Sequence, residues 1–502
     1  MTLKIYSTLS RTKDEFVPIE PGHVRMYVCG PTVYDSAHLG HARSALTFDV
    51  VRRYLQYLGY EVRLVRNLTD VDDKIIQRAQ RDGVAWHEIA RRYTDEYNRD
   101  MQDLGLIPPT VEPRATDHIA DMQALIGELV ARGAAYVVDG DVFFSVAAFP
   151  SYGRLSGQDV DQVRAGSRID VDERKRAAED FALWKSVKPG EPSWPSPWGP
   201  GRPGWHIECS AMAATQLGVP FDIHGGGSDL IFPHHENEIA QSEAASGEPF
   251  ARVWMHNGMI RVNQEKMSKS LGNFSTIRDL LALHDAETIR LFLLSQHYRS
   301  PVDFSLDGIE ESRKALARGY ATMARVDRED WGAAPKGAKA KPDAGSDPEP
   351  ALQSWDALET QFREAMDDDF NTARAIGVLF EGVRLINRLA DQARGAKGEA
   401  NQVAAREGRA HLARLGEILG VFVSSPPAWL ERDRDRRALR LGLGTEWVEE
   451  RIRARAQARV EKRWADADAI RDELARRGVV LEDRPGGVTD WSVVEAQPAS
   501  EP

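Results

Sequence analysis

The apolar positions near the start of the chain follow two different periods. Residues 24 to 28 form a short apolar run that leads into a Cys-Gly-Pro turn, whereas from residue 39 to residue 58 apolar side chains recur at helical spacing until Gly59. A second strand is predicted at residues 61 to 66. Strand, helix and strand in this order predict a parallel βαβ unit of an α/β, nucleotide-binding fold, with ligands at the carboxyl ends of the strands.

The next part of the chain interrupts this pattern. Helical segments give way to short β-like runs at 135 to 138 and 142 to 146 and to a loop rich in proline and tryptophan. Strand signals resume at 221 to 224 and 252 to 256. We therefore expect an insertion at about 115–200, after which the later strands complete the first domain.

The second half of the chain has mainly helical patterns. Residues 333–350 contain almost no large apolar side chain, which predicts a flexible linker. Helical periodicity at 351 to 419 and at 445 to 477 predicts a helical bundle followed by further amphipathic helices. The boundaries that we predict are a first domain at 1–306, a helical region at 307–332, the linker, a bundle domain at 351–423 and a small C-terminal domain at 424–502.

Composition narrows the class of protein. The sequence has two cysteines, Cys29 and Cys209, which is no disulfide framework and suits a reducing compartment. Charged residues interrupt the N-terminus before a signal-peptide core could form, and no stretch approaches the length of a membrane span. We therefore expect a cytoplasmic protein with no membrane partner.

The charge distribution limits how the chain could bind nucleic acid. A net charge of −12 opposes nonspecific binding to phosphates by the whole surface, so any RNA contact must be local. A solvated helix face paired with Glu449, Glu450 and Glu461 explains the basic C-terminal residues as well as RNA binding does. These basic residues are Arg451, Arg453, Arg455, Arg459, Lys462 and Arg463.

A histidine pair opens the first predicted helix. In His38-Leu39-Gly40-His41 the two imidazoles are three residues apart and share one face near a helix N-terminus, where backbone N–H groups and the helix dipole favour phosphate. This arrangement is suited to holding a triphosphate. Taken alone, the pair is better explained as surface or capping histidines.

A basic segment, Lys266-Met267-Ser268-Lys269-Ser270, follows the last strand signals of the first domain. Its two ammonium groups and two hydroxyls can follow the charge that moves onto the β- and γ-phosphates as pyrophosphate leaves. By itself the pentapeptide is an exposed basic loop. Its pairing with the histidine segment favours a nucleotide site.

The two segments together resemble the HIGH and KMSKS signatures of Rossmann-type aminoacyl-tRNA synthetases, with Leu39 in place of isoleucine. The resemblance narrows to the cysteinyl-tRNA synthetase family, and it implies a Rossmann-type parallel-sheet catalytic domain with an insertion, a region that contacts the tRNA stem, an α-helical bundle and a small C-terminal anticodon-binding domain. The segments that carry it are YVCGPTVYD at 27–35, NLTDVDDKI at 67–75, GWHIECSAM at 204–212, HGGGSDLIFPHHENEIAQSE at 224–243, AMDDDFNTARA at 365–375 and ADADAIRDEL at 465–474.

Two cysteines, a histidine and a glutamate form a candidate metal site. His234 and Glu238 are four residues apart and share one face if their segment is helical. With Cys29 and Cys209 they make a plausible tetrahedral zinc set. From spacing alone the cysteines could be small buried residues, and His235 could equally be the ligand. The resemblance implies one Zn²⁺ per chain on Cys29, Cys209, His234 and Glu238.

The implied zinc gives a physical basis for choosing cysteine over serine. A pocket of fixed shape rejects a near-isostere by only about two orders of magnitude, whereas zinc binds a thiolate strongly and a hydroxyl weakly. Four protein ligands normally close a zinc site, so the substrate must expand the coordination or loosen a ligand. We expect Glu238 to be the ligand that loosens.

Other residues match the family with less specific motifs. Thr69 and Trp205 match positions around the amino-acid pocket, and Gly227 and Asp229 are expected to contact ATP, within a glycine-rich turn that also holds His224 and Gly226. A core position explains Trp205 equally well, and a helix cap explains Asp229 equally well.

The resemblance implies a two-step reaction. The carboxylate of L-cysteine attacks the α-phosphorus of ATP to give cysteinyl-adenylate and pyrophosphate, and a hydroxyl of the terminal ribose of tRNA(Cys) then takes the aminoacyl group. His38, His41, Lys266 and Lys269 would act by positioning and charge stabilisation, with Mg²⁺ on the phosphates. The family implies a monomer.

Two other functions fit parts of the sequence. The runner-up is a small-molecule cysteine ligase of the mycothiol pathway, which shares the catalytic motifs but lacks a long anticodon-recognition region. The third is a noncatalytic RNA-binding or zinc-structural protein, which is expected to have lost a signature lysine or histidine, and this chain has lost none. At the end of the chain, GGVTDW departs from the Gly-Thr that commonly precedes Trp in the family.

Overall fold

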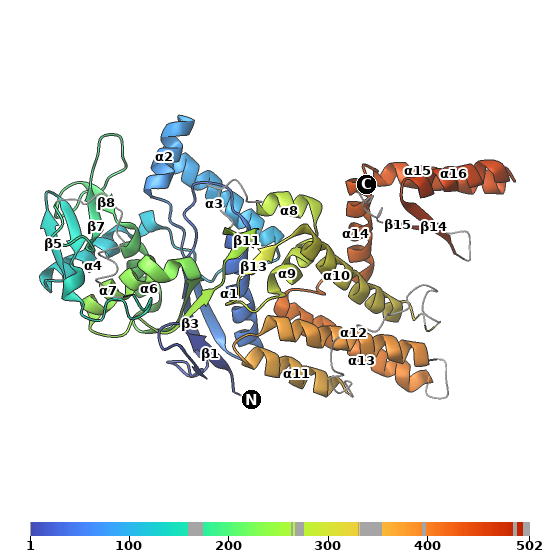
Figure 1. Ribbon diagram of the computed structural model, residues 1–502, viewed down its shortest axis with the longest axis horizontal. Coiled ribbons are helices and arrows are strands. Elements are labelled where there is room, and N and C mark those ends of the chain that lie inside the picture. The colour runs from blue at the N-terminus through green and yellow to red at the C-terminus, as the bar shows by residue number, and fades with distance from the viewer. Residues whose placement is uncertain are drawn as a thin grey trace.

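The computed structural model describes residues 2–158, 174–262, 265–266, 276–329, 331, 354–393, 398–484 and 489–494. Its centre is a parallel sheet with the strand order β10, β9, β3, β4 (Figure 1). These strands span Ala251–Asn257, Phe221–Gly227, His23–Val28 and Glu61–Arg66. The four predicted strands are therefore confirmed, and so is the parallel βαβ unit.

Helix α1 (Leu39–Tyr57) follows the first sheet strand and packs its apolar side into the largest hydrophobic core of the protein. The helix ends before Gly59, which turns the chain with a φ of +94° into β4. The hairpin of β1 (Lys4–Ser7) and β2 (Thr12–Glu15) lies beside β10. Helices α2 (Asp73–Asp82) and α3 (Trp86–Asp103) come after β4.

The expected insertion is a lobe with an antiparallel sheet of its own. Its strands β5, β6, β7 and β8 span Ala135–Val138, Asp141–Phe144, Phe181–Ser186 and Gly201–Pro203. β6 is shorter than the predicted 142 to 146, because the N–H of Val146 bonds to the Asp180 carboxylate (2.9 Å) instead of continuing the ladder. Helices α4 (Ile119–Ala131), α6 (Trp205–Leu217) and α7 (Glu236–Ser246) join this lobe to the central sheet through a second core.

The remaining elements of the first half run from the sheet toward the helical part of the protein. Strand β11 pairs with β12 on one side and with β13 on the other. The elements are β11 (Ile260–Val262), β12 (Glu265–Lys266), α8 (Ile277–Leu283), α9 (Ala286–Leu294), β13 (Val302–Phe304) and α10 (Leu306–Asp327).

The second half is helical, as predicted, and consists of two unequal parts (Figure 1). Helices α11 (Trp355–Asp367), α12 (Thr372–Gln392) and α13 (Gly398–Leu419) pack on α1 and α10 within the largest core. Helix α14 (Pro426–Arg440) leads to a separate C-terminal lobe with a small core of its own. That lobe contains α15 (Thr445–Val460), α16 (Trp464–Arg476), β14 (Val479–Asp483) and β15 (Thr489–Val493). The predicted linker at 333–350 lies outside the described residues.

A buried carboxylate links the bundle to the first half of the chain. Asp369 follows α11 and accepts hydrogen bonds from the backbone N–H of Tyr6 (2.9 Å), the hydroxyl of Tyr298 (2.8 Å) and the guanidinium of Arg299 (2.8 Å). Asp369 and Phe370 have φ values of +60° and +51°, which are uncommon for residues other than glycine. Three partners from the first half of the chain thus satisfy one buried charge, which links the bundle to that half.

Candidate active site and metal cluster

A cavity of about 620 Å³ opens at the carboxyl edge of the central sheet. It is lined where β3, β9 and β10 end and where α1 begins, which is the place predicted for a ligand in a parallel α/β sheet. Cys29, His38, His41, Trp205, Gly227 and Asp229 are the predicted site residues that line it.

The predicted histidine pair caps helix α1. The Nδ1 atom of His38 accepts the N–H of Gly40 (3.0 Å), and the Nδ1 atom of His41 accepts the N–H of His38 (3.2 Å). The two rings stack with centroids 4.0 Å apart. A Cβ atom at Gly40 would lie 2.8 Å from the His38 ring, so only glycine leaves room for this arrangement. Because each Nδ1 accepts a hydrogen bond, each neutral ring carries its proton on Nε2.

The basic segment is only partly visible. The backbone of Lys266 belongs to β12 and pairs with Arg261 of β11, and Lys269 lies outside the described residues. Thr276, the first described residue after the segment, forms a bridge with His38, and the N–H of Ile277 bonds to the carbonyl of Ala37 (3.1 Å). Thr276 and Ile277 are therefore held beside the histidine pair.

Cys29, Cys209, His234 and Glu238 form a buried cluster whose possible ligand atoms all lie within 4.8 Å of one another. The Sγ atoms of the cysteines are 3.7 Å apart, and Glu238 Oε1 lies 3.4 Å from Cys29 Sγ and 2.9 Å from His234 Nε2. Cys29 comes directly after β3, Cys209 lies in α6, and His234 and Glu238 lie on either side of the start of α7. The structure thus brings the four predicted residues together in a set that could hold a metal ion.

A second possible ligand set shares two of these residues. Cys29 and Glu238 also lie close to His224 and His235, at 2.8 Å between His224 Nε2 and Glu238 Oε2 and 3.3 Å between His235 Nε2 and Cys29 Sγ. His235 is bonded through Nδ1 to His256 Nε2 (2.8 Å). The alternative that spacing left open, His235 as ligand, is therefore also compatible with the geometry.

Two observations favour the set with two cysteines for a thiophilic metal. It offers two sulfur ligands, and soft sulfur ligands favour thiophilic metals such as zinc. Its His234 stacks on Trp205, with ring centroids 4.3 Å apart, and Trp205 lines the cavity with 36% of its surface exposed. The other nitrogen of His234, Nδ1, lies 2.9 Å from His206 Nδ1, an outer contact of the kind that fixes a ligating ring.

The charges of the cluster depend on one another. Burial acts to raise the pKa of Glu238, but His224 and His234 lower it well below its ordinary value. Burial acts to lower the pKa of His234, and Glu238 together with Cys209 raises it to about 10. Burial acts to raise the pKa of the Cys209 thiol, and hydrogen bonds from Cys29 and His234 bring it to about 6. The cluster therefore favours a thiolate at Cys209 and a carboxylate at Glu238, both of which are metal-binding forms.

The less specific predictions have mixed outcomes. Gly227 and Asp229 lie on the cavity wall, as does Trp205. Thr69, by contrast, is 1% exposed and lies behind Thr32, which does line the cavity. Its hydroxyl is donated to Glu208 (2.9 Å) rather than turned toward the opening. A direct contact between Thr69 and a substrate therefore stays a prediction, as do the catalytic and binding roles of the other residues.

Sequence reasoning did not single out several residues that surround the cluster. Glu208 and His256 are buried, His206 is half-buried, and all three are bonded to site residues or their neighbours. For His206 and Glu208 the signal was their position inside the matched segment at 204–212, whereas His256 was marked only as the end of a predicted strand. Their hydrogen-bond partners are distant in sequence, so the sequence alone did not indicate these contacts.

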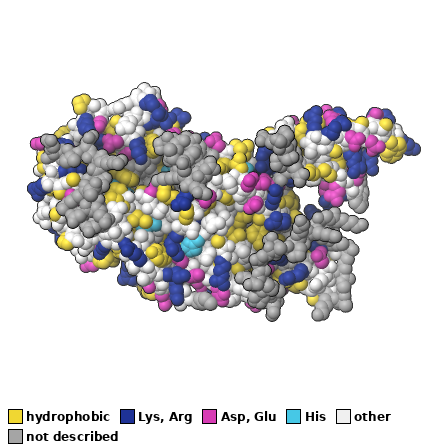
Figure 2. All heavy atoms as spheres, in the orientation of Figure 1, with side chains coloured by type: hydrophobic (Ala, Val, Ile, Leu, Met, Phe, Trp, Pro, Cys, Tyr) yellow, Lys and Arg dark blue, Asp and Glu magenta, His cyan; other side chains and the backbone are white. Residues whose placement is uncertain are grey.

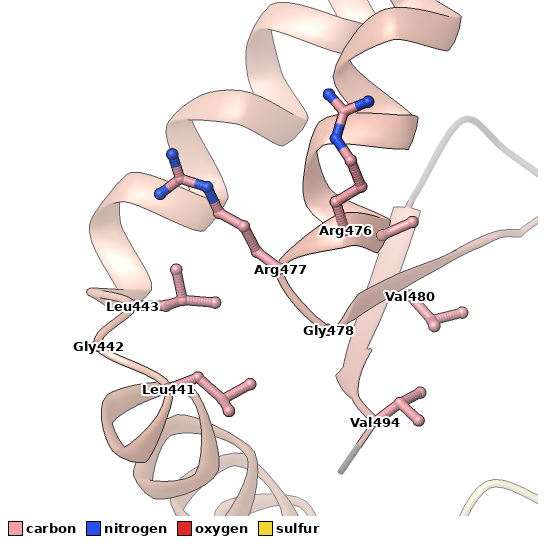
Figure 3. A pocket seen from close by; sticks show the side chains of 9 residues that line it. Leu441, Gly442, Leu443, Arg476, Arg477, Gly478, Val480 and Val494 are labelled. Atoms are coloured by element: carbon pink, nitrogen blue, oxygen red, sulfur yellow. The ribbon is translucent and has the colours of Figure 1, made fainter. Parts of the chain in front are cut away.

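A second cavity, of about 660 Å³, lies in the C-terminal lobe between the ends of α14 and α16 and β14 (Figure 3). Leu441, Leu443, Val480 and Val494 form its apolar wall, and the side chains of Arg476 and Arg477 extend beside it. Its lining contains no carboxylate, thiol or imidazole. The predicted site residues that line a cavity therefore line the first one and not this one.

The basic residues of the C-terminal lobe are largely paired with acids, and both charges are interspersed on its surface (Figure 2). Arg455 binds Asp483 through two hydrogen bonds of 2.7 and 2.8 Å, and Arg459 binds the same carboxylate at 2.8 Å. Of the partners expected from sequence, Glu461 pairs with Arg463 and Glu449 lies 3.9 Å from Arg453. The main partner, Asp483, was not among those expected.

Comparison with known protein families identifies three segments. Residues 15–314 match the family described as tRNA synthetases class I (C) catalytic domain, residues 361–423 match a DALR domain, and residues 445–489 match a cysteinyl-tRNA ligase anticodon binding domain. The chain is 52% identical over 497 residues to a cysteine–tRNA ligase of Pelobacter propionicus, with 98% of this chain and 100% of the relative covered. The chain belongs to the cysteine–tRNA ligase family.

Other members of the family give the same result. A cysteine–tRNA ligase of Geobacter sulfurreducens is 52% identical over 493 residues, covering 98% of this chain and all of the relative. The expected resemblance to this family is thereby confirmed, and so is the class of fold.

Solved structures of low sequence identity share the fold. The methionyl-tRNA synthetase of Mycobacterium tuberculosis in complex with methionyl-adenylate has a TM-score of 0.58 at 18% identity, covering 84% of this chain and 94% of that one. A putative arginyl tRNA synthetase from Campylobacter jejuni has a TM-score of 0.51 at 13% identity, covering 82% and 95%. Among the described residues, no helix is both long and apolar enough to cross a membrane.

Proposed function

We propose that this chain is a cysteine–tRNA ligase, which activates L-cysteine with ATP and transfers the cysteinyl group to the 3′-terminal adenosine of tRNA(Cys), forming AMP and diphosphate. One observation carries the proposal beyond the family assignment. A cluster with two buried thiols lies at the end of β3, beside a cavity that also contains the histidine-capped N-terminus of α1. This arrangement supports a thiol-selecting site and a phosphate site within one pocket.

The α1 end of the cavity is suited to the triphosphate of ATP. The helix N-terminus offers backbone N–H groups and the positive end of the helix dipole. With their Nδ1 atoms engaged by backbone N–H groups, His38 and His41 can each donate from Nε2 to phosphate oxygens. We assign charge stabilisation during pyrophosphate release to Lys266 and Lys269, ATP contacts also to Gly227 and Asp229, and phosphate neutralisation to Mg²⁺.

The cluster fits a zinc ion. Cys29, Cys209, His234 and Glu238 supply two soft thiolates, one imidazole and one carboxylate, all buried and within reach of one point. Zinc bound there would ligate the thiolate of cysteine and discriminate against the hydroxyl of serine. Side chains of the cavity wall would contact the rest of the cysteine substrate. Trp205 is one of them, and its ring stacks on His234.

In the proposed mechanism the protein supplies position and charge and no nucleophile. The substrate carboxylate attacks the α-phosphorus, and the histidine pair and the lysines stabilise the charge that develops on the departing pyrophosphate. A ribose hydroxyl of the tRNA then attacks the carbonyl carbon of cysteinyl-adenylate, and AMP leaves. Two residues outside the cavity, Glu208 and His206, hold site residues in place through hydrogen bonds.

The competing functions receive less support. The mycothiol-pathway ligase is not favoured, because residues 445–489 match an anticodon binding domain and the cysteine–tRNA ligases in the comparison are covered over their full length. A noncatalytic descendant is not favoured, because both signature histidines line the cavity. We propose a cytoplasmic monomer.

The test is an assay of both half-reactions. The purified protein is incubated with ATP, Mg²⁺ and labelled cysteine, with serine as control, and both pyrophosphate exchange and label on tRNA are measured along with zinc content. We expect cysteine-dependent exchange, charging of tRNA and one zinc per chain. Exchange without charging would support the small-molecule ligase instead, and neither activity in zinc-loaded protein would support a noncatalytic role.

The role of Lys269 can be tested by itself. We expect Lys269→Ala to lower the rate of adenylate formation by at least about 100-fold, as for the loss of one stabilising group in a transition state, with little change in cysteine affinity. Rapid-quench measurement of adenylate formation and a separate binding titration give the two quantities. Equal losses in both would contradict the assigned role.

A further inference from the structure

A row of three buried polar side chains connects the two segments that carry the cysteines. Asn67 Nδ2 donates to Thr69 Oγ1 (3.4 Å), and Thr69 Oγ1 donates to Glu208 Oε2 (2.9 Å). Each of the three residues is 1% exposed. A buried carboxylate is costly unless it is hydrogen-bonded. Because water does not reach these three side chains, their hydrogen bonds to one another supply the partners that water would otherwise provide.

One end of the row grips the turn after Cys29. Asn67 Oδ1 accepts the N–H of Gly30 (2.8 Å), and the backbone of Thr69 exchanges hydrogen bonds of 3.2 Å with Pro31 and Val33. The contact is close: a Cβ atom at Gly30 would lie 1.7 Å from the carbonyl oxygen of Asn67. Only glycine permits this approach, and it fixes the Cys29 turn against the segment that follows β4.

The other end of the row grips helix α6. Glu208 is the residue immediately before Cys209, so its carboxylate and the Cys209 thiol leave adjacent positions of the same helical turn. The chain of contacts therefore runs from Cys29 through Gly30, Asn67, Thr69 and Glu208 to Cys209. Its two ends are thus the two cysteines of the metal cluster, which are 180 positions apart in sequence and whose thiols are themselves hydrogen-bonded.

We propose that Asn67, Thr69 and Glu208 form a brace that sets the position of Cys209 relative to Cys29, and that they are thereby positioning residues for the metal cluster. The proposal rests on the proposed function in one respect, namely that the cluster binds zinc. It differs from the expectation that Thr69 contacts the substrate. Outer residues that orient metal ligands typically change metal affinity by about 10- to 100-fold when they are removed.

The experiment measures zinc affinity directly, by competition with a chromophoric chelator, and ligand geometry by the absorption spectrum of the Co²⁺-substituted protein. Thr69→Val removes the hydroxyl at constant shape, and Glu208→Ala removes the acceptor. We expect each substitution to weaken zinc binding by about 10- to 100-fold. The double variant should bind zinc no more weakly than the single variant with the lower affinity, because both substitutions break the same row.

Matched variants guard against a merely structural effect. Thr69→Ser keeps the hydroxyl and Glu208→Gln keeps an acceptor oxygen, so both are expected to retain wild-type zinc affinity and the wild-type Co²⁺ spectrum. Asp70→Asn changes a buried neighbour that bonds to Thr116 instead of the row, and it should leave zinc affinity unchanged. Circular dichroism of the metal-free proteins verifies that each variant folds, and the conservative pair carries the test if the others do not.

The outcomes separate this proposal from the proposed function. Wild-type zinc affinity in Thr69→Val and Glu208→Ala, with a raised KM for cysteine in Thr69→Val alone, would overturn the brace and support a substrate contact. Equal loss in Asp70→Asn would also overturn it, since the effect would then be general. If the wild-type protein itself charges tRNA but binds no zinc, the zinc assignment fails and the brace fails with it, while the ligase function stands.

Discussion

Charged side chains are arranged in opposite ways at the two ends of the protein. Beside the central sheet, Cys209, His234 and Glu238 are fully buried and their polar atoms converge on one point. On α15 the arginines spread along a largely exposed helix, and both the buried Arg455 and the exposed Arg459 bind one acid, Asp483, whose side chain is 37% exposed. Water is excluded from the first set, so its members must satisfy one another or a ligand. In the second set, water reaches Asp483 and screens its pairs in part.

The comparison teaches where function can be inferred from charge. An exposed ion pair is worth about 0–1 kcal/mol and is a poor guide to purpose. A buried group of potential ligands is costly to assemble, and its persistence therefore points to a bound ion or substrate. Substitutions that break each arrangement should differ accordingly in their effects.

The largest effect is expected from the thiols. Cys29→Ser and Cys209→Ser each replace a soft ligand with a hydroxyl of similar size, and we expect zinc affinity to fall by more than about 100-fold, beyond the effect of any outer residue. Cysteine-dependent pyrophosphate exchange should be lost in parallel. Chelator competition and exchange assays measure both, and Ser210→Ala, a change at the residue next to Cys209, serves as control. Full zinc content in either serine variant would contradict the assignment of that thiol.

A smaller effect should distinguish the two possible ligand sets. If Cys209 and His234 complete the metal site, His234→Asn should weaken zinc binding at least about tenfold more than His235→Asn, because His235 would then be an outer residue bonded to His256. Metal affinity of the two variants, measured side by side, is sufficient. A larger loss in His235→Asn would indicate that His224 and His235, and not Cys209 and His234, complete the metal site.

The smallest effect is expected in the C-terminal lobe. The bonds from Arg455, opposed in part by burial, hold the pKa of Asp483 well below its ordinary value, so this carboxylate contributes stability at pH values above its unfolded pKa of about 4. That contribution is lost as pH falls through the lower folded value. Asp483→Asn should remove it at neutral pH, by no more than about 1 kcal/mol, because water reaches the Asp483 carboxylate even though Arg455 is buried.

Thermal melts from pH 7 to pH 2, followed by tryptophan fluorescence, provide the measurement for this pair, because the loss occurs below the unfolded pKa. The wild-type lobe should lose stability relative to Asp483→Asn as the pH drops. Parallel pH profiles for the two proteins would indicate that the pair contributes nothing. Glu482→Gln, at the next position of the same strand, is the matched control.

Local signals were enough to predict the frame of the protein. The strands at 24 to 28 and 61 to 66 and the helix between them follow from short-range periodicity and a terminating glycine, because these elements are decided within a few residues. The four residues of the metal cluster required the resemblance as well, since their spacing also allowed His235. Their convergence is a product of the sheet order, which brings β9 beside β3.

Other features depend on partners that are distant in sequence. Thr69 matched a pocket position, yet its hydroxyl turns to Glu208, because the helix that carries Glu208 packs directly beneath it. Asp483 was not expected as the partner of Arg455, since only the return of β14 along α15 brings it close. Periodicity and motif spacing contain no information on such pairings, and Lys269 lies outside the described residues.

The shared core has a consequence for how the chain can be divided. Helices α11 to α13 bury their apolar faces in the same core as α1 and α10, and Asp369 is bonded to three residues of the first half. The covalent connection between α10 and α11 is thus not what keeps the two halves together. A chain cut between them would be expected to behave as a split enzyme, whose fragments assemble by complementation, whereas the C-terminal lobe, with a core of its own, could be exchanged as a module.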